Sequence, residues 1–208
     1  MSDLSLSRQI QAMPKAEIHV HLEGAIQPAT LFELAKRHHR LDALPAHDAA
    51  GLHAAYQFEN FSKFIKLYLL ISDLLRTPED FATIVESCGA DMAAQNIRYR
   101  ELTFTPYTHA DYQNKRLTID DLLEGLDAGR EVARRRYGVE MRWVFDVPRN
   151  YAFEQRERGY DPGVARRTLE YALRGMAHGV VGLAWAGLKQ GRRRSHLPRN
   201  LRLRKPPV

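Results

Sequence analysis

Two histidines near the amino terminus, His19 and His21, are the residues whose types and spacing could do chemistry. They stand two positions apart in a segment whose β-branched Ile18 and Val20 favour a strand, and alternate side chains of a strand point to one face. Two imidazoles on one face suit a divalent metal, because Zn²⁺ accepts neutral imidazole nitrogens as ligands. The spacing also fits a half-buried strand with two incidental histidines, so both interpretations stay open at this point.

The surrounding pattern predicts the elements that would position this pair. Gly24 ends the extended pattern, and Pro28 stands where the first turn of a helix tolerates proline. Hydrophobic periodicity and end signals then predict alternating elements along the chain. Strands are predicted over residues 16–21, 97–104 and 140–146 and from 180, helices over 29–38, 60–75, 79–95, 119–137 and 162–178, and a loop and short turn over 42–53. This order predicts an α/β fold with a parallel sheet and right-handed crossovers.

Composition excludes several classes of protein. The 208 residues contain one cysteine, Cys88, which cannot form an internal disulfide and fits a reducing cytoplasm. No apolar run reaches transmembrane length, and the first ten residues lack the pattern of a signal peptide. We therefore expect a cytoplasmic protein with no membrane partner.

The carboxyl-terminal residues differ in character from the rest of the chain. Eight of the 31 lysines and arginines lie in residues 188–208, and the other 23 are outnumbered by the 25 acidic residues. The formal charge of +6 therefore belongs to this tail. Its lack of aromatic residues argues against a nucleic-acid partner, because base stacking needs them. We expect residues 1–187 to form the folded part and residues 188–208 to be a basic tail, either disordered or produced by a change of reading frame.

A longer string containing the two histidines resembles the opening motif of the adenosine deaminase family of metal-dependent amidohydrolases. That string is Pro14-Lys15-Ala16-Glu17-Ile18-His19-Val20-His21-Leu22-Glu23-Gly24. Three further stretches resemble the same family in the same order: Phe58-Glu59-Asn60-Phe61-Ser62-Lys63-Phe64, Tyr99-Arg100-Glu101-Leu102-Thr103-Phe104-Thr105-Pro106 and Gly179-Val180-Val181-Gly182-Leu183. The resemblance covers about residues 8–187.

The resemblance implies a parallel (β/α) barrel of the TIM type, truncated here to roughly its first four βα units. It also implies zinc-dependent hydrolytic removal of the amino group from an aminopurine nucleoside or base, which makes that small molecule the expected partner. The residues implied are His19 and His21 as metal ligands, and Glu23, Gly24, Phe61, Phe64 and Gly187 in substrate binding. Phe61, Phe64 and Tyr68 also have the helical spacing of core residues.

Two positions depart from the members that act on adenosine. Those members often have Arg where Thr103 stands and Asp where Glu23 stands. Both differences favour the adenosine deaminase-like, adenine deaminase or aminodeoxyfutalosine deaminase branches.

Much of the family's catalytic machinery is absent from this sequence. None of the nine histidines begins an H-x-x-E motif, and no Asp or Glu follows Glu170, so no catalytic residue is assigned. A catalytic zinc site needs at least three protein ligands, and a full barrel takes about 250 residues. Asp146, at the end of a predicted strand, could reach the site, whereas His109 is interpreted as a loop histidine. The alternative function is a catalytically incompetent fragment or a basic-tailed interaction module.

Overall fold

The computed structural model describes residues 6–57, 60–149 and 161–186. Its centre is a sheet of four parallel strands in the order β1-β2-β3-β4, so each strand pairs with the next one along the chain. The strands span Lys15–His21 (β1), Ile97–Phe104 (β2), Glu140–Pro148 (β3) and Val180–Ala186 (β4). The predicted α/β fold with a parallel sheet is confirmed.

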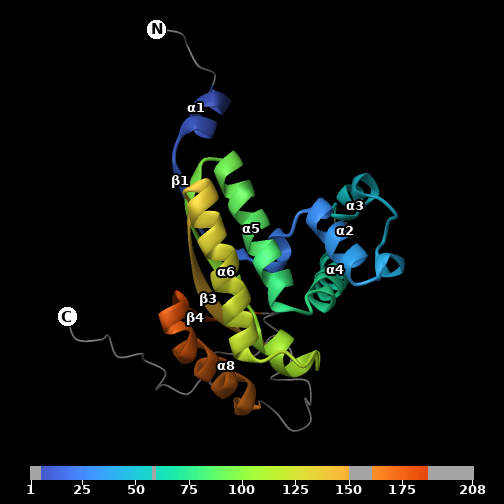
Figure 1. Cartoon of the computed structure of the whole chain (residues 1–208), viewed down its shortest axis with the longest axis vertical. Coiled ribbons are helices and arrows are strands. Elements are labelled where there is room, and N and C mark those ends of the chain that lie inside the picture. Colours follow the sequence, from blue (N-terminus) through green and yellow to red (C-terminus); the bar gives the residue numbers. More distant parts are fainter. Residues whose placement is uncertain (1–5, 58–59, 150–160, 187–208) are drawn as a thin grey trace, which may run out of the picture.

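Helices connect these strands, and α5, α6 and α8 lie along the sheet while α2, α3 and α4 form a group to one side (Figure 1). The α-helices span Leu6–Ala12 (α1), Pro28–Arg37 (α2), Ala49–Ala55 (α3), Phe61–Leu74 (α4), Pro78–Ala94 (α5), Ile119–Tyr137 (α6) and Pro162–Gly175 (α8). Shorter turns of helix span Glu23–Ala25 (η1), Leu41–Ala43 (η2), Thr108–Tyr112 (η3) and Met176–His178 (η5). Within the described residues, no helix combines the length and the hydropathy that crossing a membrane requires.

The loop and short turn predicted over residues 42–53 are confirmed up to residue 48, where η2 and irregular chain lie, and wrong beyond it. Residues 42–53 contain the start of α3, whose first turn is capped by the Asp48 side chain accepting a hydrogen bond from the backbone N–H of Gly51. Such a cap satisfies a backbone donor that the helix itself cannot. A seven-residue helix with a glycine inside it gives little periodic signal, which is why the pattern was interpreted as a loop.

The two faces of the sheet have different environments. Along β3, Met141, Trp143 and Phe145 are buried in the core that the helices cover. The alternating residues Arg142 and Val144 are only partly buried, because they point to the opposite face. The inner face of a (β/α) barrel corresponds to this second face.

Helices α5 and α6 pack closely because glycines stand at their contact. A Cβ placed on Gly129 of α6 would lie 2.6 Å from the carbonyl oxygen of Ala82, and one on Gly125 would lie 2.3 Å from that of Pro78. Both distances are shorter than any real Cβ contact. The two helices run side by side in Figure 1, and the missing side chains allow that approach.

A bulge interrupts β1 immediately before the histidine pair. Glu17 pairs with Arg100 in the register and Val20 pairs with Leu102, so β1 carries one extra residue between these points. His19 lies at this irregularity and adopts a left-handed conformation, with φ 64°. Val20 packs against the helix-covered core. The bulge therefore directs His19 and His21 to the opposite face.

Candidate functional site

The candidate site lies at the carboxyl ends of β1, β2 and β3. His21 is the last residue of β1, and Thr103 pairs with it in β2. Asp146 lies near the end of β3, one residue past the pairing of Phe104 with Phe145. Side chains at the carboxyl ends of neighbouring parallel strands converge, which is where barrel enzymes place their active sites.

The two histidines lie together, as their spacing predicts for one strand face. Their ring centroids are 5.7 Å apart, with 48° between the ring planes. The edge of the His21 ring also faces Tyr68 of α4, with centroids 6.3 Å apart. Burial lowers the pKa of His21 and outweighs the opposing charge of Glu23, with His19 acting in the same direction as burial, and so favours the neutral imidazole that a metal requires.

Asp146 is a buried carboxyl group beside this pair. Its side chain is fully buried, and neither oxygen has a hydrogen-bond partner among the described residues. Oδ2 lies 4.0 Å from Nδ1 of His21. Burial raises the pKa of Asp146 to about 7; the nearby Thr105 side chain opposes this shift, and the negative charge of Glu23 acts in the same direction as burial. The expectation that Asp146 could reach the site agrees with this position.

Glu23 is held by a chain of buried polar groups. Its Oε1 is 3.1 Å from Nε2 of His109, and both side chains are almost completely buried. On the other side of the ring, Nδ1 of His109 is 3.0 Å from Nζ of Lys115. Lys115 also donates to the backbone carbonyls of Ser72 and Leu75. With Lys115 donating to Nδ1, a neutral His109 can donate from Nε2 to the Glu23 carboxylate.

The pKa shifts of this chain follow from burial and from these bonds. Burial is the largest single effect on the pKa of Glu23 and acts to raise it, but the hydrogen bond and charge of His109, a backbone hydrogen bond and the charge of His21 together outweigh burial, so the net shift is downward. Burial lowers the pKa of His109, and it lowers that of Lys115 to about 7. The arrangement is therefore an ionised Glu23 beside a neutral His109.

Aromatic rings fix the orientation of His109. Its ring stacks on Phe104 with centroids 5.3 Å apart and 9° between planes, and meets the edge of Phe81 at 5.0 Å. The interpretation of His109 as a loop histidine was wrong, because His109 lies within the helical turn η3 and is completely buried. Its partner Glu23 lies 86 residues earlier in the chain, so no local pattern could indicate the pair.

A small cavity adjoins the site. Its volume is about 20 Å³, room for about one water molecule, and its lining includes Gly24, Phe64 and Tyr68. A Cβ on Gly24 would meet nothing closer than the Cβ of His21 at 3.6 Å, so the fold itself does not require glycine there. Phe61 begins α4, whose side chains are described from Lys63 onward, and Gly187 lies outside the described residues. The substrate roles of all these residues remain predictions.

The histidine pair fits part of a zinc site. Both rings are imidazoles at contact distance, and Nδ1 of His21 is buried without a hydrogen-bond partner. In the described ranges, no three His, Cys, Asp or Glu side chains converge as a metal site would require. Zn²⁺ would thus find two suitable ligands here, and His19 and His21 remain the predicted ones.

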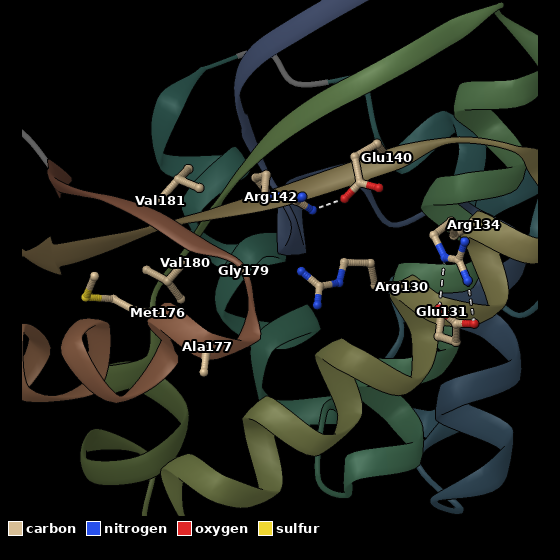
Figure 2. Close-up of a pocket in the computed structure, with 10 residues that line it drawn as sticks. All are labelled: Arg130, Glu131, Arg134, Glu140, Arg142, Met176, Ala177, Gly179, Val180 and Val181. Carbon is tan, nitrogen blue, oxygen red and sulfur yellow. Dashed lines mark hydrogen bonds and ion pairs between the residues drawn. The ribbon is translucent and has the colours of Figure 1, made fainter. Parts of the chain in front are cut away.

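A larger cleft lies at the other end of the strands. Its volume is about 440 Å³, and it is lined by the starts of β3 and β4 and by the last turns of α6 (Figure 2). Three arginines line it, each paired with a carboxylate: Arg130 with Asp127, Arg134 with Glu131, and Arg142 with Glu140. These pairs neutralise the cleft. It lies at the amino ends of the strands and is separate from the candidate site.

Comparisons with known proteins agree with this architecture. The profile of the family described as "Adenosine deaminase" matches residues 14–200, which extends past residue 187. The aminodeoxyfutalosine deaminase of Streptomyces coelicolor is 37% identical over 150 residues, covering 71% of this chain and 37% of that protein. The adenine deaminase of Pseudomonas syringae pv. syringae is 34% identical over 158 residues, covering 76% of this chain and 48% of that protein.

A solved structure shows the same fold. The adenine deaminase of Arthrobacter aurescens superposes with a TM-score of 0.69 at 24% identity, covering 86% of this chain and 50% of that one. The chain thus spans half or less of the length of each of these three proteins. With the family profile matched over most of its length and the sheet and helices superposed, the chain belongs to the adenosine deaminase family.

Proposed function

We propose that this chain supplies the amino-terminal half of the active site of a zinc-dependent deaminase that acts on an aminopurine nucleoside or base. The observation that carries the proposal is the contact between the His19 and His21 rings at the carboxyl end of β1. Family membership supports it, because this family consists of metal-dependent hydrolases and the relatives above are named as deaminases of aminopurine compounds.

In this proposal His19 and His21 hold two positions on the metal. A bound Zn²⁺ would supply Lewis-acid activation of a water for attack on the carbon that carries the amino group. Glu23 presents a carboxylate oxygen, Oε2, that has no hydrogen-bond partner among the described residues and can accept from a substrate hydroxyl or N–H. Gly24 leaves space beside it for the substrate.

The aromatic side of the pocket would come from α4 and from residues beyond β4. Phe64 lines the small cavity with Gly24. We propose Phe61 and Gly187 as further substrate contacts, on the family pattern alone. The protein would act in the cytoplasm, where the single thiol of Cys88, buried in the core, stays reduced.

Zinc binding by the full chain tests the metal assignment. We expect the wild-type chain to bind Zn²⁺, measured by competition with a chromophoric chelator, and His19→Asn and His21→Asn each to weaken binding at least about tenfold. His39→Asn is the matched control, because His39 is exposed and also has a positive φ of 54°. Equal zinc affinity in all four proteins would contradict the assignment.

A deaminase assay separates a working enzyme from the alternative, a catalytically incompetent fragment. Adenine, adenosine and aminodeoxyfutalosine are the substrates to try, with ammonia release as the measurement. We expect little or no turnover by this chain alone, because the sequence has no H-x-x-E motif and the described residues supply two ligands. Turnover at ordinary enzyme rates would show that residues of this chain complete the site.

A further inference from the structure

Asp146 is a buried carboxyl group for which the proposed function has no role. Its side chain is fully buried, and neither oxygen makes a hydrogen bond of normal geometry among the described residues, although the Thr105 side chain lies close enough to lower the pKa of Asp146. A buried carboxyl group without a partner destabilises the fold, whether it stays ionised or takes up a proton. A replacement by an apolar residue would avoid that cost, so a use for the carboxylate is expected at this position.

The nearest ring nitrogen is Nδ1 of His21, and it is also without a partner. Nδ1 is fully enclosed, and it lies 4.0 Å from Oδ2 of Asp146. A normal N–H···O hydrogen bond is about 2.9 Å long, so a shift of roughly 1 Å in either side chain would let Nδ1–H of His21 donate to the Asp146 carboxylate. The His21 side chain is about one-third exposed although Nδ1 is enclosed, so the rest of the ring faces the open side of the site.

The strand geometry explains how the two groups meet. Asp146 alternates with Phe145 and Val147, which are buried in the apolar cores, and so lies on the opposite face of β3. The bulge in β1 places His21 on that same face. Both residues stand at the carboxyl ends of their strands, with β2 between them.

We propose that Asp146 is a positioning residue for His21: its carboxylate accepts a hydrogen bond from Nδ1–H, which fixes the ring orientation and leaves Nε2 to bind a divalent metal. A carboxylate behind a metal-binding histidine commonly sets its tautomer in this way. The role of Nε2 rests on the proposed function, whereas the Nδ1–H tautomer of His21 is a property of the metal-free chain.

The tautomer can be measured directly. In the ¹⁵N-labelled metal-free chain at pH 8, long-range ¹H–¹⁵N spectra report which nitrogen of each histidine carries the proton. We expect His21 to be protonated at Nδ1 in the wild type and to shift to the Nε2–H form in Asp146→Ala. The signal is assigned by its loss in His21→Asn.

The chain contains a matched control pair. His178 donates from Nδ1 to Asp127, far from the site, so Asp127→Ala should change the signals of His178 and leave those of His21 unchanged. Asp146→Asn, which keeps an acceptor oxygen and nearly the same shape, should retain more of the Nδ1–H form than Asp146→Ala. It also provides a folded variant for the comparison if the alanine form unfolds.

Zinc affinity gives a second measurement. Loss of such a carboxylate weakens metal binding about 10–100-fold, so Asp146→Ala should do so and Asp127→Ala should not. His21 in the Nε2–H form in the wild type, or unchanged in both Asp146 variants, would overturn the proposal. A chain that binds no Zn²⁺ but shows the predicted tautomer would refute the proposed metal site and leave the role of Asp146 toward His21 standing.

Discussion

Replacing His109, the hydrogen-bond donor to Glu23, should lower the stability of the chain by an amount that follows from the structure. In His109→Phe the new ring can occupy the slot between Phe81 and Phe104, whose centroids lie 5.0 and 5.3 Å from the present ring. Shape is therefore retained, while the Glu23 carboxylate loses its hydrogen bond and Lys115 loses one of its three contacts. Glu23 is 0% exposed in this structure, so bulk water does not solvate the carboxylate that has lost its donor.

The expected loss of stability in His109→Phe is large because the charge of the Glu23 carboxylate stays buried. Breaking a buried pair by removing one partner costs about 3–5 kcal/mol, whereas replacing both partners with apolar groups of similar size is often close to neutral. Glu23→Met alone leaves a buried neutral imidazole and should cost about 1–3 kcal/mol. The single costs sum to about 4–8 kcal/mol, so a double variant Glu23→Met/His109→Phe that is close to neutral should be more stable than that sum predicts by most of this amount.

Urea unfolding of the full chain, followed by circular dichroism, measures these free energies. The matched control is the exposed pair of Glu131 and Arg134 on α6, whose coupling energy should be below about 1 kcal/mol. A cost below about 1 kcal/mol for His109→Phe would refute the assignment of Glu23 as an ionised group held by His109. A double variant whose cost equals the sum of the single costs would refute it equally.

Two further predictions concern Lys115 and the contact between helices. The folded chain should release the Lys115 proton near pH 7, whereas the unfolded chain holds it to about pH 10.5. The free energy of unfolding of the wild type, relative to that of Lys115→Met, should therefore rise by up to about 1.4 kcal/mol per pH unit between pH 7 and pH 9. A stability difference that does not change over this range would show that the buried amine titrates normally. Gly129→Ala should lower the midpoint of thermal unfolding. Alanine favours a helix over glycine by about 1 kcal/mol, but its Cβ would clash with the backbone of α5, and such overpacking costs about 1–3 kcal/mol or more. An unchanged or higher midpoint would mean that α5 and α6 separate easily.

The order of strands and helices was predictable because each element carries its own signals. Thr77 and Thr118 both form capping boxes, with Asp80 and Asp121, at the predicted starts of α5 and α6. Gly138 ends α6 in the left-handed conformation, as its position after the last periodic residue indicates. Such signals lie within a few residues of the boundary they set, so the sequence alone reveals them.

The candidate site was only partly predictable because its contacts are not local. The two histidines could be found from their spacing, and Asp146 from its place at a strand end. The pairing of Glu23 with His109 joins segments far apart in the chain, and the ammonium of Lys115 is bound by carbonyls that close α4. Periodicity indicates which residues are buried, but it does not indicate which buried polar groups meet.

The bulge in β1 has a consequence for the choice of substitutions at residue 19. His19 has a φ of 64°, a conformation that Asn tolerates well and that β-branched residues tolerate poorly. His19→Val would combine the loss of an imidazole with backbone strain of about 1–3 kcal/mol, and the strain could return the strand to regular alternation. His21 would then turn toward the helices, so one substitution would remove both rings from the site. Asn at residue 19 removes the imidazole alone, and the difference between His19→Asn and His19→Val measures how much of the metal site depends on the shape of the strand.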